Sequence, residues 1–517
     1  MAQAYKMMRE VELEEEEKAR AEGRAIHPVI MSIRQDRQDD QRRYNAPRAN
    51  EIAVIFQNVD GEPPFDRDIR VHCRGETRTQ QISILHPQCD PMTYPLLFPH
   101  ADDGWKTKMS HCGVNNSYIT QIEYFSYRLA VRDEFNPLLN AGKLTQQYIV
   151  DSYVKAEANR LNYIKCNQSK LRVEYYSGLM DHINNRAENE GIKAGKAVIL
   201  PSSFQGSPRN MQQHYQDAMA IVRKFGKPDL FITMTCNPKW KEIRENLTPW
   251  QRPEYRPDLI ARVFHLKLKE LMKDIGERHI LGVPVAKIHV IEFQKRGLPH
   301  AHILVILRED DKPRTREIID KLVCAEIPDL STNPRLLEIV MRNMVHGPCG
   351  ALNPRSPCME DGKCSKGFPK GFENETHENV DGYPRYRRRE DGRTFEVGNR
   401  SVDNRWIVPY NPYLSLKFSC HINVEICASV KGVKYLFKYV YKGHDCANVE
   451  IRENVDGVGT LNYDEIKSFL DSRYVSAPEG MWRLLAFKMH EKSHPIARLA
   501  VHLPNQQPVY FHENKQQ

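Results

Sequence analysis

The sequence predicts an α+β fold: a central antiparallel sheet with flanking helices on one face, an N-terminal α/β region and a Cys/His zinc-binding insertion. Two β-rich runs, "KIHVIEF" and "HAHILVIL", are separated by the Gly- and Pro-bearing "QKRGLP", which indicates adjacent antiparallel strands. The next stretch, "REDDKPRTREIIDKLVCAEI", has a helical pattern. From His346 to about Asn411 the chain is rich in Gly, Pro, Cys and Arg, which is typical of irregular structure.

Composition narrows the class of protein. The 517 residues allow two or three domains, and 75 Lys+Arg against 67 Asp+Glu give a net charge of +8, which suits a polyanionic partner. There is no run of 18 apolar residues and the N-terminus is charged, so we expect an intracellular protein without signal peptide or membrane span. Twelve cysteines spread over a long chain favour reduced thiols or a metal site over disulfides.

Two histidines one residue apart lie in the second β-rich run. Side chains alternate along a strand, so His300 and His302 share a face, about 7 Å apart along the pleat, and can bind one divalent metal. A hairpin brings the carboxylate of Glu292 back beside them, and such a set leaves coordination positions open. The spacing alone is weak evidence, because 20 histidines in this chain give about one His-x-His by chance, usually a structural one.

Residues 431–445, "KGVKYLFKYVYKGHD", predict a helix that extends over about 426–442. Tyr435 and Tyr439 are four residues apart and therefore lie on one helical face. Aromatics at this spacing are usually core residues, but a core gives no reason for the neighbouring lysines. Phosphate chemistry gives a reason for them, since nearby cations favour the ionised phenolate form of a tyrosine that attacks a phosphate. The lysine stripe consists of Lys434, Lys438 and Lys442.

The Cys/His-rich stretch contains four soft metal ligands in the order His-x2-Cys-x8-Cys-x5-Cys: His346, Cys349, Cys358 and Cys364. This pattern suits a closed tetrahedral structural zinc site, and the alternative is a set of buried thiols. Cys420, Cys427 and Cys446 have no such spacing. The following "YPRYRRR" suits phosphate contacts and base stacking, and its alternative is a solvated basic loop. Its arginines are Arg385, Arg387, Arg388 and Arg389.

"EFQKRGLPHAH" together with "YLFKYVYK" resembles the paired motifs of the two-tyrosine HUH endonucleases, specifically the Rep region of Helitron transposons. "YPLLFPHADDGW", "LPSSFQGSPRNMQQHYQDAMAIVRKFGKPDLFITMTCNPKW" and "HGPCGALNPRSPCMEDGKCSKGFPK" resemble Helitron Rep proteins as well, and the likeness covers most of residues 85–515. The resemblance implies an HUH/Rep-type sheet whose first motif strand, "FITMTCNP", places Thr233, Thr235 and Asn237 on one face.

The resemblance also implies roles for individual residues. His300, His302 and Glu292 would bind the catalytic Mg²⁺ or Mn²⁺, while Tyr435 and Tyr439, supported by Lys438 and Lys442, would be the nucleophiles. Tyr441, about half a turn away, is expected to pack. The residues expected to contact DNA are Thr235, Asn237, Lys295, Arg296, Lys434 and the arginines of "YPRYRRR".

The implied activity is metal-dependent cleavage and transfer of single-stranded or melted DNA in rolling-circle transposition, through 5′-phosphotyrosine intermediates, in the nucleus. Full-length relatives continue into a helicase. The nearest approach to a phosphate loop, "GIKAGKA", has the wrong spacing and no hydroxyl after the lysine, so we expect neither ATPase nor nucleotide cofactor. The alternatives are an inactive or domesticated DNA-binding remnant and a metal hydrolase of small substrates.

The motifs divide the chain into six predicted segments. They are a charged helical extension (1–55), an N-terminal Helitron-like region (56–200), a Rep/HUH catalytic core with the first motif and metal site (201–345), a zinc-like and basic insertion (346–412), the tyrosine helix (413–445) and a C-terminal region (446–517) that precedes the helicase in relatives.

Overall fold

The computed structural model of the chain describes most of residues 79–497, with gaps, and a few short segments before them. The described residues are 20, 32–33, 53–55, 69–72, 79–113, 117–168, 193–194, 198–293, 297–378, 383–398, 400–427, 449–450, 460–461, 465–470 and 473–497. Residues 428–445 of the predicted tyrosine helix, with both tyrosines and the lysine stripe, lie outside these residues, as do Lys295 and Arg296.

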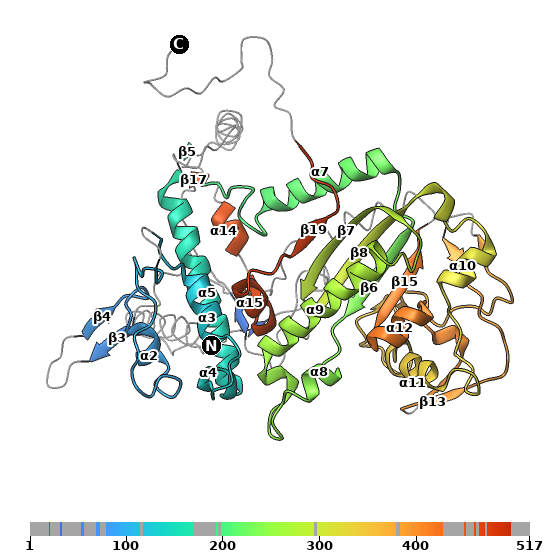
Figure 1. The fold of residues 1–517 in the computed structure, drawn as a ribbon, viewed down its shortest axis with the longest axis horizontal. Coiled ribbons are helices and arrows are strands. Elements are labelled where there is room, and N and C mark those ends of the chain that lie inside the picture. The colour runs from blue at the N-terminus through green and yellow to red at the C-terminus, as the bar shows by residue number, and fades with distance from the viewer. Residues whose placement is uncertain are drawn as a thin grey trace, which may run out of the picture.

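The described elements mix helices and short strands throughout the chain (Figure 1). The α-helices are α2 Cys89–Thr93, α3 Gln121–Arg128, α4 Pro137–Asn140, α5 Lys143–Cys166, α7 Pro208–Phe225, α8 Lys241–Arg244, α9 Pro257–Gly276, α10 Arg316–Leu322, α11 Pro334–Asn343, α12 Pro412–Phe418, α14 Glu465–Leu470 and α15 Ala477–Leu484. The 3-10 helices are η2 Pro253–Tyr255, η3 Glu309–Asp311 and η4 Asn404–Trp406.

The strands among the described residues form eight sheets, seven of two strands and one of five. In chain order the strands are β1 Ser32–Ile33, β2 Ala53–Ile55, β3 Ile69–His72, β4 Thr79–Ile82, β5 Lys193–Ala194, β6 Leu230–Thr235, β7 Pro284–Phe293, β8 Pro299–Leu307, β9 Met359–Glu360, β10 Lys363–Cys364, β11 His377–Glu378, β12 Pro384–Arg385, β13 Phe395–Val397, β14 Arg400–Val402, β15 Ile422–Ile426, β16 Val449–Glu450, β17 Thr460–Leu461, β18 Tyr474–Ser476 and β19 His490–Lys492.

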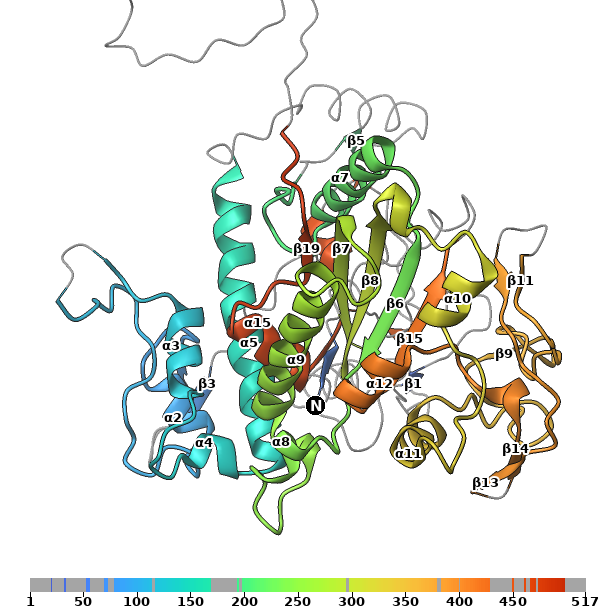
Figure 2. The same cartoon turned by 45° about the vertical axis from the view of Figure 1, so that its right-hand side comes forward.

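The largest sheet is antiparallel throughout, with five strands in the order β15-β6-β8-β7-β19 (Figures 1 and 2). Its centre is the predicted hairpin: β7 pairs with β8, and Glu292 lies opposite His300. Gly297 in the connection has φ of +68°, a conformation that glycine adopts without strain. The prediction of two adjacent antiparallel strands is therefore confirmed.

Helices cover both faces of this sheet. Successive strand residues point to opposite sides, so each face presents its own set of apolar side chains to a helix. On β6, Leu230, Ile232 and Met234 belong to a large buried cluster that includes Phe264 and Leu271 of α9. Phe231, between them, belongs to a second cluster with Ala218 and Ile221 of α7. The expectation that helices would lie on one face only is thus wrong. The amphipathic α7 covers part of the face that also carries the histidines.

The sheet joins segments that are far apart in the sequence. Its inner strands come from residues 230–307, whereas the edge strands β15 and β19 come from 422–426 and 490–492. Three of the segments into which the sequence divides therefore contribute to one sheet. The long helix α5, which precedes the sheet in the chain, packs against α3 and against α15, which follows β15. The buried Arg473 forms an ion pair with Glu157 of α5, which is also buried.

The segment between α11 and α12 is a module of short strands and turns beside β15 (Figure 2). Its small core contains Met344, Val402, Ile407 and Tyr410, which cluster with Val340 of α11. The irregular structure predicted here is observed. The helical pattern before it is only partly realised, as η3 and α10. Within the described part of the chain, no helix has the length and apolarity needed to cross a membrane.

Candidate functional site

His300 and His302 lie together on one face of β8, an interior strand whose nine residues are all buried. Their ring centroids are 4.5 Å apart with an interplanar angle of 74°. Phe231, on the neighbouring strand, stacks on His302 at a centroid distance of 5.8 Å. The apolar β-branched residues of β7 and β8 thus build a buried hairpin, and the two histidines lie near the end of the hairpin that carries the connection.

Each histidine is oriented by a residue on an adjacent strand. Thr235 lies opposite His300 in the register, and its hydroxyl is 2.7 Å from Nδ1 of that ring. Glu292 lies opposite His300 from the other side, but its Oε2 is 2.9 Å from Nε2 of His302. A second residue that fixes a histidine ring is typical of metal sites and of structural histidines alike. The hairpin thus brings Glu292 beside His300 and His302, as expected from the sequence, and the contact of Thr235 with His300 is an addition that the sequence did not predict.

Asn237, another residue of the first motif, makes its hydrogen bonds away from the histidines. Asn237 follows β6 and donates from Nδ2 to the carbonyl of Ser419 at 2.8 Å, while its Oδ1 accepts from the amide of Lys239. These bonds connect the end of β6 to the segment that enters β15. Thr233, by contrast, lies opposite His302 in the register and is buried.

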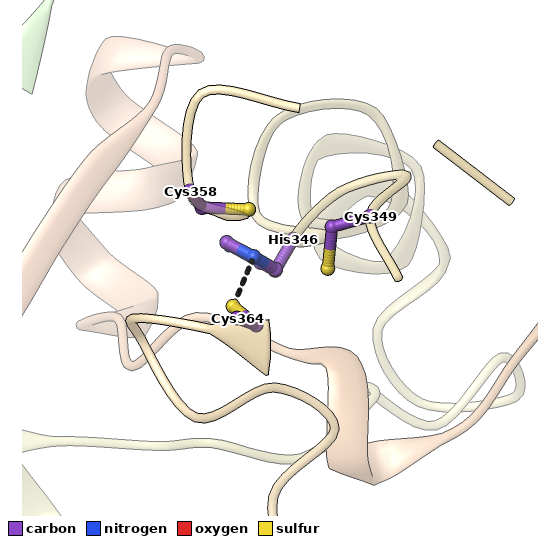
Figure 3. A group of neighbouring side chains, drawn as sticks. All are labelled: His346, Cys349, Cys358 and Cys364. Carbon is purple, nitrogen blue, oxygen red and sulfur yellow. Dashed lines mark hydrogen bonds between the residues drawn. The ribbon is translucent and has the colours of Figure 1, made fainter. Parts of the chain in front are cut away.

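A second group of potential ligands lies in the module beside β15 (Figure 3). His346, Cys349, Cys358 and Cys364 turn toward one another, and one ligand atom from each lies within 4.8 Å of all the others. The Sγ of Cys364 is 3.4 Å from Nε2 of His346. Three thiolates and one imidazole converging in this way fit a tetrahedral metal ion such as zinc. The predicted spacing of the four residues is thus matched by their convergence.

The electrostatics of this group set the protonation of its ligands. Burial, and then the positive charges of Arg400, Lys370 and Lys366, lower the pKa of His346 to about 4, so the ring is neutral at pH 7, the form that binds metal. Burial raises the pKa of Cys349 to about 12. Burial also opposes ionisation of Cys364, but hydrogen bonds from the backbone of Phe368 and Lys366 lower its pKa overall.

Residues around the four ligands fix their geometry. Gly347 has φ of +95°, and a Cβ there would lie 2.7 Å from Nη1 of Arg400. Nη2 of Arg400 donates to the carbonyl of His346, and Phe368 stacks on the His346 ring at 4.1 Å. A zinc ion with three thiolates and a neutral histidine carries a net charge of −1, which Arg400 complements. The sequence did not identify Arg400, which lies outside the Cys/His-rich stretch, or Phe368, which lies within it but carries no signal that it stacks on His346.

We expect loss of one ligand to release the metal from this group. Cys364→Ser should lower bound zinc from about one ion per chain to a small fraction, because a closed site needs all four ligands. Zinc is measured by elemental analysis after gel filtration, and the loop between Gly350 and Gly367 should become sensitive to limited proteolysis. The control is Cys166→Ser, which alters an exposed cysteine. Full zinc occupancy in Cys364→Ser would contradict the assignment.

The basic run 383–389 is mostly engaged in structural contacts. Arg388 is only 3% exposed, and its Nη1 donates to the carbonyls of Ala325, Asn404 and Ile407. The expectation that Arg388 contacts DNA is therefore wrong. Arg387 and Arg389 pair with the buried Glu326 and remain partly exposed, whereas the side chain of Arg385 is 62% exposed. The hydroxyl of Tyr386 accepts from the amide of Ile426 in β15.

Arg388 and Arg385 should respond differently to substitution. Arg388→Met removes the donor that three buried carbonyls share, which should destabilise the module by roughly 3–5 kcal/mol. Arg385→Met should change stability by less than about 0.5 kcal/mol, as for most surface substitutions. Urea unfolding followed by Trp fluorescence compares them, since Trp406 lies in the module. Equal stability of the two variants would contradict the structural role of Arg388.

These features define a class: a mixed helix and antiparallel-sheet protein with a Cys/His group that can bind a metal ion such as zinc. Residues 124–305 match the family model described as the Helitron helicase-like domain at the N-terminus. The matched residues are thus similar to that domain, and they include β6, β7, most of β8 and both histidines. The chain matches none of the curated proteins with which it was compared.

Proposed function

We propose that the protein is a metal-dependent endonuclease and strand transferase that acts on single-stranded or melted DNA in rolling-circle transposition of Helitron type. The observation that carries the proposal is the row Thr235, His300 and Glu292 across three strands of a sheet inside the matched domain. With Nδ1 of His300 engaged by Thr235, this ring would bind a metal through Nε2. His302 and Glu292 would complete a two-histidine, one-carboxylate set.

A Mg²⁺ or Mn²⁺ bound there would supply Lewis-acid stabilisation of the charge that develops on a scissile phosphate. The nucleophile in the proposal is the phenolate oxygen of Tyr435 or Tyr439. Its attack forms an O–P bond, breaks the bond between phosphorus and the 3′ oxygen, and leaves a 5′-phosphotyrosine and a 3′ oxyanion, which takes up a proton to become the 3′-hydroxyl. The phosphodiester energy stays in the covalent link, so that rejoining needs no nucleotide.

The other parts of the chain have supporting roles in this proposal. The Cys/His group would bind zinc and hold the module against β15, without taking part in the chemistry. Lys295, Arg296, Lys434 and Arg385 would contact the DNA backbone. In the cell the protein would act in the nucleus, together with the helicase domain found in full-length relatives.

Formation of a covalent adduct tests this function. The full chain is incubated with a pool of single-stranded oligonucleotides and Mn²⁺, then analysed on a denaturing gel. A 3′ label should appear on the protein and a 5′ label should not, because the proposed link is to the 5′ phosphate of the downstream fragment. Cleavage without an adduct would indicate a hydrolase with a water nucleophile. Salt-sensitive binding with no cleavage in any metal would indicate a DNA-binding remnant.

A further inference from the structure

A row of residues crosses the sheet through the histidine face, and it is polar from β15 to β8. Asn423 on β15 lies opposite Thr233 on β6, and Thr233 lies opposite His302 on β8. Directly opposed residues of antiparallel strands share a face, so Asn423 is on the same face as the histidines. Neighbouring strands are about 4.8 Å apart, which places Asn423 roughly 10 Å from His302. The apolar neighbours of Asn423, Ile422 and Val424, point into the core on the other face.

The two ends of this row differ. At the β19 end, His490 lies opposite Val290 and stacks on His214 of α7 at 4.2 Å. That end is therefore covered by a helix. At the β15 end, Asn423 and Glu425 are both partly exposed. A ligand at the histidines would thus extend toward β15.

The orientation of the Asn423 amide is fixed by its neighbour. Nδ2 of Asn423 donates to Oε1 of Glu425 at 3.0 Å. A carboxylate only accepts hydrogen bonds, so the NH₂ group must face it and the amide oxygen must point away. This Oδ1 is shielded from solvent and has no hydrogen-bond partner among the described residues. A buried acceptor without a donor is unfavourable, and such groups in native proteins usually have a partner.

We propose that Asn423 is a specificity-determining residue that accepts a hydrogen bond from an N–H group on an unpaired base, while the adjacent phosphate lies over His300 and His302. The inference rests on the proposed function in that the ligand is single-stranded DNA. Phosphates and internal deoxyriboses carry no hydrogen-bond donor, whereas every base has an amino or ring N–H group. An acceptor held in this position therefore selects a base edge and not the backbone.

A thermodynamic cycle between residue and base tests the inference. Binding of fluorescent single-stranded oligonucleotides to the zinc-loaded full chain is measured without added Mg²⁺ or Mn²⁺, so that no cleavage is needed. A tight-binding oligonucleotide is selected first, and each base is then replaced in turn by an analogue without its donor, such as purine for adenine. At one position the replacement should weaken wild-type binding about tenfold and should leave the affinity of Asn423→Ala unchanged. The control Asn246→Ala alters an exposed asparagine that follows α8, and it should behave as wild type.

Each other outcome overturns the inference. If wild type and Asn423→Ala lose affinity equally at every position, Asn423 reads no base. If the effect of Asn423→Ala appears only when Mn²⁺ is added, the residue contacts a metal-bound water. If single-stranded DNA does not bind the wild-type chain at all, the proposed function fails together with the inference. Adduct formation with no coupling at Asn423 would leave the proposed function intact and remove only the base contact.

Discussion

Phenylalanine at both Tyr435 and Tyr439 should abolish the protein–DNA adduct, with a loss of at least about a thousandfold, because the reaction would have no oxygen nucleophile. Binding of single-stranded DNA should persist, since phenylalanine keeps the aromatic ring that stacks on bases. The measurement is the adduct assay with a 3′-labelled oligonucleotide and Mn²⁺, run beside an equilibrium binding assay on the same protein preparation.

The matched control is Tyr441→Phe, which removes a hydroxyl from the same short segment. On the predicted helix Tyr441 would lie about half a turn away from the other two, so loss of its hydroxyl should leave adduct formation within about twofold of wild type. Single variants should each keep one nucleophile and form some adduct. Full adduct formation by the double variant would show that another residue attacks the phosphate, and it would remove the two-tyrosine assignment.

The part of the site that could be predicted is the part set by local sequence. β7 and β8 are joined by a short connection, and alternation along each strand decides which side chains share a face. That logic placed Glu292 beside the histidines, and the observed register agrees. The four residues of the Cys/His group were predicted from spacing alone, because the ligands lie within one short stretch of chain.

Long-range pairing accounts for most of what the sequence did not predict. β15 and β19 are five and three residues long and are placed by partners far away in the chain. Nothing in their local pattern identifies those partners. The second helical layer was missed for a similar reason: the apolar stripe of α7 indicates a buried face but does not say which side of the sheet it covers.

Arg388 was expected to contact DNA, but its guanidinium group is buried. A run of arginines between tyrosines has the composition of a nucleic-acid-binding loop. Arg388 instead satisfies carbonyls from Ala325, Asn404 and Ile407, and Glu326 neutralises the arginines on either side. These partners lie outside the run, so composition alone could not separate the buried arginine from its exposed neighbour Arg385.

Alanine at both His300 and His302 should lower the rate of metal-dependent cleavage about a thousandfold. The bound ion is expected to contribute several kcal/mol of transition-state stabilisation, and each 1.36 kcal/mol corresponds to a factor of about ten in rate. Thr235→Val keeps the shape of the side chain but removes the hydroxyl 2.7 Å from Nδ1 of His300. Its effect should be smaller, about 10- to 100-fold, as for other residues that orient a metal ligand. Single-turnover cleavage over a series of Mn²⁺ concentrations measures all three rates.

The dependence on Mn²⁺ separates a metal site from a purely structural pair of histidines. If Thr235 orients a ligand, Thr235→Val should recover part of its rate as Mn²⁺ is raised, whereas the double alanine variant should not. The control is His377→Ala, which removes an exposed imidazole from β11 and should cleave as wild type does. His300 and His302 are both buried, so thermal unfolding of each variant must be compared as well. Loss of cleavage that follows loss of folded protein, with an unchanged Mn²⁺ requirement in the remainder, would show that the histidines support the sheet and bind no catalytic ion.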